Sequence, residues 1–453
     1  MRQCLLVLVL GVAAFATGGA SAGGSGPSAP AHPSEAGVAV GVVNVTGGPE
    51  QIDETQLAVG ADGTAAVAWS RFLGHTTVIR VALRPAGGHR FAPPQTVSLP
   101  AEVSREPQLA VGPDGKVAVV WFAYPGKRIV VREATRRPGK ARFDPPVVIS
   151  RGGIALSPRV AISPDGTTTV AWAWEGSGRS VGIQEVTRPK GSRRFSVPKT
   201  LLRGGYQPNP TALVTAGLDG STTIGWTRNG HLETVTRRRG KRRFDRPVRV
   251  AAHVRSFALS QGGEGTTALA WESEDRHVRI GMATRRGHTT FGAKQTLSNT
   301  ESDAQAGTDS KGRAAHRIRI AEMDPAVVVN RDGLVTVAWL RPTSSGWVLD
   351  VAWRARASMR WHTRCAVEDG LDPICAPAIA PSSRGSRIVW CAFTGGIYET
   401  TLSDGTFETH RRLSQPAADV SAPRIAATPR GGAIVVWTKV VKLDQIEQLT
   451  KLA

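Results

Sequence analysis

Cysteines are few and acidic residues are outnumbered in this sequence of 453 residues. None of the 4 Cys has another Cys or a His nearby at zinc-finger spacing, so we expect no metal site and no cofactor. The 36 Asp+Glu residues stand against 57 Lys+Arg, a formal net charge of +21, which favours anionic partners. No catalytic signature is found. Hydrophobic residues make up 41% of the chain, which provides a core and excludes wholesale disorder.

Only one long apolar stretch occurs, beginning at Leu5, and it is short for a membrane span. Arg2 precedes it and the tripeptide ASA follows it, the pattern of a secretory signal with its cleavage site. We therefore predict that residues 1–22 are a signal peptide, with an uncleaved anchor as the less favoured alternative. The protein is expected to be secreted, extracellular or associated with the cell wall, with no transmembrane segment after cleavage. Residues 23–37 are rich in Gly, Pro and Ser and predict a flexible linker.

The strongest pattern is a repeated hairpin, in which an apolar strand, a tight turn and a second apolar strand end in Trp. The eight copies end at Trp69, Trp121, Trp172, Trp226, Trp271, Trp339, Trp390 and Trp437. Five copies have an Asp-Gly turn, such as Asp114-Gly115, which supplies the positive φ that a tight hairpin needs. Apolar residues occupy both positions before each Trp, so both faces of this strand are predicted to be buried. We interpret the Trp residues as packing between sheets rather than as a ligand platform.

Each hairpin is followed by a third strand, a loop rich in Gly and Arg, and an aromatic residue that opens a short fourth strand. This repeat predicts an all-β fold, an eight-bladed β-propeller of four-stranded antiparallel blades over residues 38–453. The segment from Val45 aligns without gaps with the segment from Val97, so the N-terminal strand is predicted to complete the last blade as its fourth strand. That arrangement would close the ring and remove two sheet edges. The 16 residues after Trp437 would form the third strand of the same blade.

The hairpins resemble those of a known group of secreted propellers. The segments SPDG at residues 163–166 and GPDGKVAVVW at residues 112–121 resemble hairpins of bacterial propellers of the YVTN and TolB-like kinds, which implies a propeller fold and a binding role. The sialidase Asp-box does not match, because its Gly lies two residues after Asp, whereas Gly166 directly follows Asp165. The docking motif of quinoprotein dehydrogenases places Trp four residues after Gly, not six as from Gly166 to Trp172, so that resemblance stops at the number of blades.

Three cysteines remain after the predicted cleavage, so one disulfide and one further thiol are expected outside the cell. Counting outward from the hairpin turn places Cys375 nearly opposite Cys391, with Cys365 on the preceding outer strand. Either Cys365–Cys375 or Cys375–Cys391 fits this arrangement. We favour Cys365–Cys375, because disulfides between adjacent strands are strained.

In a four-stranded blade, the first-to-second and third-to-fourth loops lie at one end, and here that end is basic in successive blades. The candidate polyanion-binding residues are Arg136, Arg137, Lys140, Arg142, Arg193, Arg194, Arg237, Arg238, Arg239, Lys241, Arg242 and Arg243. Such a charge concentration favours wall polymers, acidic glycans, phosphates or extracellular DNA as partners, and solvated loops with a biased composition are the alternative. We do not expect sequence-specific nucleic-acid binding, because the Phe residues open strands instead of lying between the charges.

The opposite end of a propeller normally holds the ligand site, and here its loops are mixed in charge. The candidate ligand-face residues are Tyr124, Trp174, Glu175, Glu272 and Asp303. The connection over residues 299–324 is 18 residues longer than the one between Ser98 and Pro107, and this insertion projects from the same end and is either functional or structural. Paired carboxylates from three of these residues would suit an extracellular carbohydrate-active hydrolase or lyase, but their separation decides that chemistry.

The sequence thus predicts a secreted, monomeric binding or interaction module. Its expected partner is a cell-surface polymer, a glycan or a protein. A carbohydrate-active enzyme is the rival interpretation, and the balance favours a protein without catalytic activity. An acid cluster that converges on the axial channel, with pKa values pushed apart, would favour the enzyme.

Overall fold

A computed structural model describes residues 7–14, 41–46, 50–177, 180–204, 211–275, 277–287, 289–298, 325–343, 346–355, 358, 360–367, 375–392, 395–415 and 420–441. Strands dominate these residues, and a 3-10 turn, Gly263–Gly265, is also present. No helix in the described ranges is long and apolar enough to cross a membrane. The predicted all-β class is confirmed.

The described strands form eight antiparallel sheets, seven with four strands and one with five. The first four sheets consist of β3 (Ile52–Val59), β4 (Ala65–Leu73), β5 (Thr76–Arg84) and β6 (Gln95–Thr96); β7 (Val103–Val111), β8 (Val117–Tyr124), β9 (Val130–Arg136) and β10 (Val147–Val148); β11 (Ile154–Ile162), β12 (Thr168–Glu175), β13 (Val181–Arg188) and β14 (Lys199–Gly204); β15 (Ala212–Ala216), β16 (Thr222–Arg228), β17 (His231–Arg237) and β18 (Val248–Ala251). The last four consist of β19 (Val254–Gln261), β20 (Thr267–Asp275), β21 (His277–Arg285) and β22 (Gln295–Thr296); β23 (Ala326–Val329), β24 (Val335–Thr343), β25 (Gly346–Arg354) and β26 (His362–Val367); β27 (Ala378–Pro381), β28 (Gly385–Cys391), β29 (Ile397–Ser403), β30 (Thr406–Phe407) and β31 (Arg411–Arg412); β32 (Val420–Ala427), β33 (Ala433–Val441), β1 (Val7–Ala14) and β2 (Gly41–Asn44).

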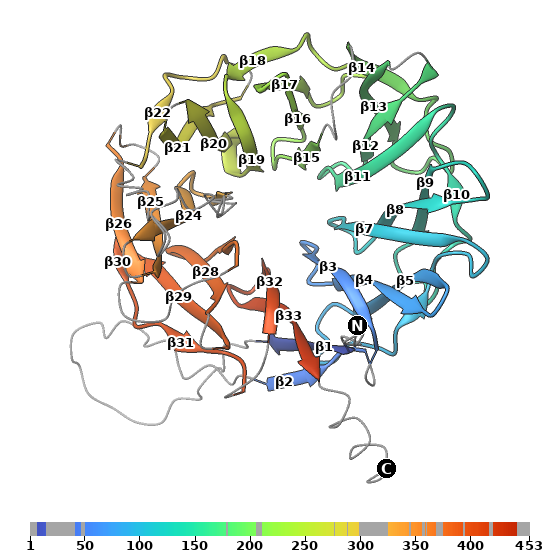
Figure 1. Cartoon of the computed structure of the whole chain (residues 1–453), viewed down its shortest axis with the longest axis horizontal. Helices are drawn as coiled ribbons and strands as arrows, with labels where there is room; N and C mark the ends of the chain where they lie inside the picture. Colours follow the sequence, from blue (N-terminus) through green and yellow to red (C-terminus); the bar gives the residue numbers. More distant parts are fainter. Residues whose placement is uncertain are drawn as a thin grey trace, which may run out of the picture.

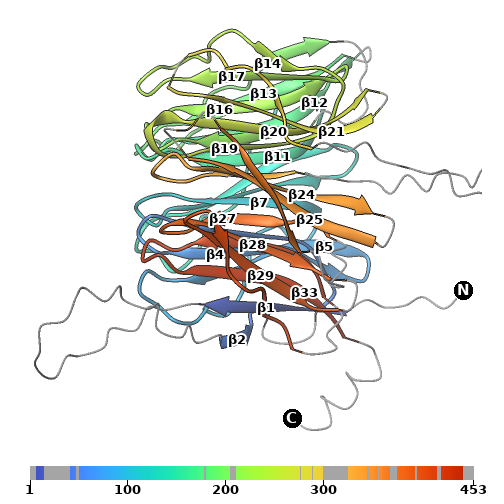
Figure 2. The same cartoon turned by 90° about the vertical axis from the view of Figure 1, so that its left-hand side faces the viewer.

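The sheets are arranged side by side around a common centre, with their first strands innermost (Figure 1). Each first strand contacts the first strand of the next sheet, and β32 of the eighth sheet contacts β3 of the first. Figure 2, turned by 90°, shows the strands running across the thickness of the molecule, so that their connections lie at its two ends. The inner strands therefore carry the side chains nearest the centre, and the loops carry those at the ends.

The Trp at the end of each hairpin is buried, as the alternation predicted. Six of the eight are 0% exposed, and Trp271 and Trp437 are 4% and 2% exposed. Trp121, for example, packs with Ala66 and Val81 of the neighbouring first sheet. The Asp-Gly turns also have the predicted geometry, with φ of 76° at Gly115. The repeated hairpin therefore supplies both the turn and the contact between sheets.

The eighth sheet joins strands from both parts of the chain, in the order β32-β33-β1-β2. β1 pairs with β33, with Gly11 opposite Trp437, and β2 pairs with β1. The sequence predicted that residues after Trp437 form the third strand. That prediction is wrong in the described structure, because β33 itself continues to Val441 and the apolar β1 takes the third position. The predicted signal peptide includes β1, and its cleavage stays a prediction.

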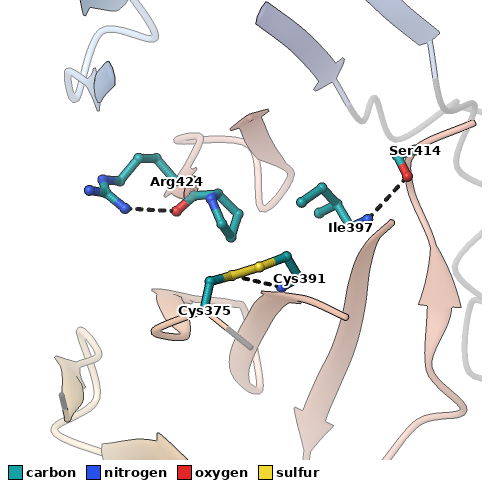
Figure 3. Close-up of a disulfide and its surroundings, with 6 residues drawn as sticks. Cys375, Cys391, Ile397, Ser414 and Arg424 are labelled. Atoms are coloured by element: carbon teal, nitrogen blue, oxygen red, sulfur yellow. Dashed lines mark hydrogen bonds between the residues drawn. A yellow bond between two sulfur atoms is a disulfide. The ribbon is translucent and has the colours of Figure 1, made fainter. Parts of the chain in front are cut away.

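The disulfide joins Cys375 to Cys391, with 5.5 Å between their Cα atoms (Figure 3). The favoured pair Cys365–Cys375 is therefore wrong, and the alternative pair is the one formed. Regular pairing between β27 and β28 ends at Ala378 and Val389, so Cys375 lies beyond the ladder and its backbone is not held in the geometry of paired strands. Cys365 lies on β26 of the preceding sheet.

We expect replacement of both Cys375 and Cys391 by Ala to lower the free energy of unfolding. The bridge spans 16 positions in sequence, and in the chain-entropy model the closure of a loop of this size contributes about 3 kcal/mol. Chemical denaturation of the oxidised protein would measure the loss. Cys365→Ala is the control, with an expected loss below about 1 kcal/mol. An equal loss in the two variants would contradict the assigned bridge.

Candidate polyanion-binding site

The first-to-second turns and the third-to-fourth loops lie together at one end of the sheets, which we call the turn end. In the second sheet, Arg136 Nη1 donates a hydrogen bond of 2.8 Å to the carbonyl oxygen of Gly115 in the turn of the same sheet. Lys116 Nζ donates one of 2.5 Å to the carbonyl oxygen of Gly166 in the turn of the third sheet. Loops of neighbouring sheets therefore form one continuous surface, as the order of strands predicted.

Ten of the twelve candidate basic residues are exposed on this surface. They are Arg137, Lys140, Arg142, Arg193, Arg194, Arg238, Arg239, Lys241, Arg242 and Arg243. Two of them have acidic partners, since Arg137 pairs with Asp144 at 2.9 Å and Arg238 pairs with Asp245 at 3.5 Å. The other eight form no ion pair with any described residue. Most of the positive charge at the turn end is therefore not neutralised by neighbouring carboxylates.

Loops of the second and fourth sheets are built alike. The backbone N–H of Lys140 donates to the carbonyl oxygen of Arg137 at 3.1 Å, and that of Lys241 donates to Arg238 at 3.0 Å. Gly139 occupies the left-handed region at the tip, with φ of 70°. The ion pairs to Asp144 and Asp245 brace the loop base, which leaves the basic residues at the tip exposed.

Arg237 corrects the predicted set, because it is buried, with 6% of its surface exposed. Its Nη1 donates to the hydroxyl of Thr187 at 2.5 Å and its Nη2 to that of Thr169 at 2.7 Å, both on the neighbouring third sheet. Its guanidinium lies over the Phe244 ring, 5.1 Å from the centroid. β17, the third strand of the fourth sheet, ends at Arg237, and the arginine side chain fills the space between the third and fourth sheets. Arg136 is half-buried for a related reason, since it binds backbone oxygens of its own sheet.

The same arrangement of an arginine over an aromatic ring recurs in other sheets. Arg188 lies over Phe195 at 4.5 Å and Arg285 over Phe291 at 4.9 Å. Each of these arginines precedes its aromatic residue by six or seven positions. That spacing alone does not mark burial, because Arg238 also precedes Phe244 by six positions and is exposed. Sequence reasoning also missed an exposed basic residue in the third-to-fourth loop of the fourth sheet, Arg246.

The two aromatic candidates of the opposite end are only partly exposed to solvent. Tyr124 is 36% exposed at the end of β8 and packs edge-on against Phe122, with ring centroids 5.6 Å apart. Trp174 is half-buried, and its Nε1 donates to the carbonyl oxygen of Gly152 at 2.9 Å. Neither side chain presents a fully open aromatic face.

Two of the three acidic candidates, Glu175 and Glu272, are described, and they lie on different sheets, the third and the fifth. Glu272 is buried, with 3% exposed, and forms an ion pair of 3.3 Å with Arg255, so its carboxylate is already engaged. Glu272 follows Trp271 on β20, and the side chains at this part of the strand are buried. Glu175 is half-buried at the end of β12. Asp303 lies outside the described residues. No group of His, Cys, Asp and Glu side chains in the described ranges is placed to hold a metal ion.

No family model matches the chain, so the resemblance to YVTN and TolB-like hairpins has no support from a sequence family. No curated protein matches it significantly. The BP39L lectin from Burkholderia pseudomallei is 14% identical, with a TM-score of 0.47, and the match covers 80% of this chain and 95% of the lectin. Polysaccharide lyase Uly1 is 10% identical, with a TM-score of 0.42, over 91% and 94% of the chains. The β-propeller domain of the Trilobed protease from Pyrococcus furiosus is 10% identical, with a TM-score of 0.43, over 81% and 99%. These similarities carry no argument about what this chain binds.

Proposed function

We propose that this protein is a secreted, closed eight-bladed propeller that binds acidic polymers at its turn end. The succession of contacts from each inner strand to the next, with β32 against β3, supports closure. The strands β1 and β2 in the eighth sheet support a ring completed by the N-terminal part of the chain. Secretion would place the basic surface in contact with cell-surface polymers.

The observation that carries the binding proposal is the set of exposed basic side chains without acidic partners. Surface charge of one sign raises the local concentration of polyanions and speeds their association. A polymer gains further because each contact releases counterions from it. The carboxylates at this end have structural partners: Asp144 and Asp245 pair with Arg137 and Arg238, and those of the Asp-Gly turns, such as Asp114 and Asp165, accept hydrogen bonds from the backbone of their own turns. A binding role therefore accounts for the surface better than catalysis.

The test is to neutralise three exposed residues of the fourth-sheet loop together, Lys241→Gln, Arg242→Gln and Arg243→Gln. With heparin and a random-sequence duplex DNA as probes, the affinity should fall, and the slope of log K against log salt on DNA should decrease by about 2 to 3, since each lost phosphate contact contributes about 0.9. Fluorescence anisotropy over a salt series would measure both quantities.

A matched control removes the same charge from the opposite end, at Lys127→Gln, Arg128→Gln and Arg151→Gln. All three residues are exposed there. This variant should keep most of the affinity and the salt slope of the unmodified protein. Equal losses in the two variants would mean that net charge alone acts, and no loss in the first would remove the proposal.

A further inference from the structure

The innermost strands of the first three sheets share one distortion at the same position. The pairing of β3, β7 and β11 with the next strand shifts register near the start of each inner strand. At these bulges Glu54, Glu106 and Ser157 have φ of 56°, 52° and 48°. Residues other than glycine rarely adopt this left-handed conformation. Bulges of this kind redirect side chains and are frequent beside functional sites.

The redirected side chains form a hydrogen-bonded chain from sheet to sheet. Glu54 Oε2 accepts from the backbone N–H of Glu106 at 2.7 Å and from the Ser70 hydroxyl at 2.5 Å. Glu106 Oε2 accepts in turn from the Ser157 hydroxyl at 3.1 Å. Burial raises the pKa of Glu54 above its ordinary value, although both hydrogen bonds oppose the shift. Two carboxyl groups are thus held on the inner wall, at the end away from the Asp-Gly turns.

Two arginines lie on inner strands beside this chain. Arg159 follows Ser157 by two positions on β11, and Arg424 lies on β32. Each donates from Nη1 to the carbonyl oxygen of the preceding proline at 3.0 Å, and neither forms an ion pair with a described residue. Burial lowers the pKa of both, Arg424 further lowers that of Arg159, and Glu106 opposes that shift. These charges are therefore near enough to affect one another.

The direction of Arg424 agrees with this placement. Figure 3 shows its side chain extending away from the Cys375–Cys391 disulfide of the neighbouring sheet, toward the middle of the ring of sheets. Both arginine residues are half-buried. A guanidinium that is partly removed from water and has only one neutral acceptor retains donors for an oxyanion.

We propose that Glu54, Glu106, Ser157, Arg159 and Arg424 form a second binding site, which takes a small hydroxylated monocarboxylate such as a uronic acid. A carboxylate suits the two arginines, because a guanidinium can bind both of its oxygens. Ligand hydroxyls suit the oxygens of the two glutamates and the serine, which accept hydrogen bonds. The glutamates disfavour a doubly charged phosphate at the same place, since like charges repel.

The site is separate from the proposed polyanion site. Its residues lie near the first residues of the inner strands. The basic loops lie at the turn end, next to the last residues of the same strands. Loss of one activity should therefore leave the other unchanged, and the two proposals fail independently.

Isothermal titration of the full chain with D-glucuronate, glucose, acetate and inorganic phosphate tests the proposal. We expect glucuronate to bind at least about tenfold more tightly than any of the other three, because it alone engages both kinds of group. Arg159→Gln and Arg424→Gln should each weaken glucuronate binding by about tenfold or more, while heparin retention stays at the level of the unmodified protein. Arg193→Gln, at the turn end, is the control and should leave glucuronate binding unchanged.

Thermal melts establish that each variant is folded. If Arg424→Gln does not fold, Arg424→Lys retains the charge but loses the paired donors, and it should still weaken binding severalfold. The proposal is overturned by a folded protein that does not bind glucuronate, by phosphate or acetate binding as tightly as glucuronate, or by folded arginine variants with unchanged affinity.

Discussion

Replacement of Trp121 by Ala is expected to lower the free energy of unfolding by about 3–5 kcal/mol, the range for a large aromatic residue removed from a core. Trp121 is 0% exposed and packs between the first and second sheets, against residues such as Ala68 and Ile79. Both neighbours are on β4 and β5, which are fixed in their own sheet, so the cavity cannot collapse without moving that sheet. Urea denaturation followed by circular dichroism would measure the change.

A comparison of two Trp→Phe variants separates packing from hydrogen bonding. Trp121 Nε1 has no hydrogen-bond partner in the described part of the chain, whereas Trp69 Nε1 donates to the buried Glu50 at 3.2 Å. Trp69→Phe should therefore cost about 1–3 kcal/mol more than Trp121→Phe, because it leaves a buried acceptor without this donor. Equal losses, or an unchanged melt for Trp121→Ala, would contradict the assigned role of these residues.

Replacement of Arg188 should lower the free energy of unfolding by a similar amount, for an electrostatic reason. Arg188 Nη2 lies 2.9 Å from Glu133 Oε1, and the two residues are 7% and 2% exposed between the second and third sheets. Arg188→Met leaves the Glu133 carboxylate buried without its main partner, which costs about 3–5 kcal/mol. Arg193→Ala, an exposed arginine without an ion pair among the described residues, is the control and should change stability by less than about 0.5 kcal/mol.

The loss caused by Arg188→Met should depend on pH. Burial raises the pKa of Glu133 above its ordinary value of 4.5, and Arg188 opposes that shift. Without Arg188 the folded-state pKa rises further, so the folded chain binds a proton that the unfolded chain releases. Stability then falls as the pH rises from 4.5 through the raised pKa. The deficit should be large at pH 7 and small near pH 4, and Glu133→Gln in the same chain should restore much of the stability. A deficit independent of pH would contradict this account.

Local signals made the hairpins predictable from the sequence. An Asp-Gly pair such as Asp114-Gly115 sets the turn, and alternation along the next strand sets the burial of Trp121. The burial of Arg237 could not be predicted from the neighbouring sequence. It depends on two threonine hydroxyls, those of Thr169 and Thr187, which the third sheet places opposite Arg237. The basic loops were thus predictable as a set, whereas the members turned inward were not.

Two further features depend on register, which composition does not reveal. The disulfide partner of Cys375 was decided by where pairing between β27 and β28 ends. The carboxyl groups of Glu54 and Glu106 meet on the inner wall because of bulges in two separate strands. The two glutamates occupy the same place in the repeat, in ETQLAVG at residues 54–60 and EPQLAVG at residues 106–112, but this pattern does not show where their side chains lie. A structure was therefore needed to bring these residues together.

The predicted signal peptide contains β1, so its removal would change the eighth sheet. Val7–Ala14 pairs along its whole length with β33, and β2 reaches the eighth sheet only through β1. A leader peptidase that cuts after residue 22 would detach this strand and leave the donors and acceptors of β33 open to a replacement. Precursor and processed chain would then differ in adhesiveness, since an open strand edge recruits strands from other polypeptides. Material expressed with and without residues 1–22 should be treated as two species when self-association is studied.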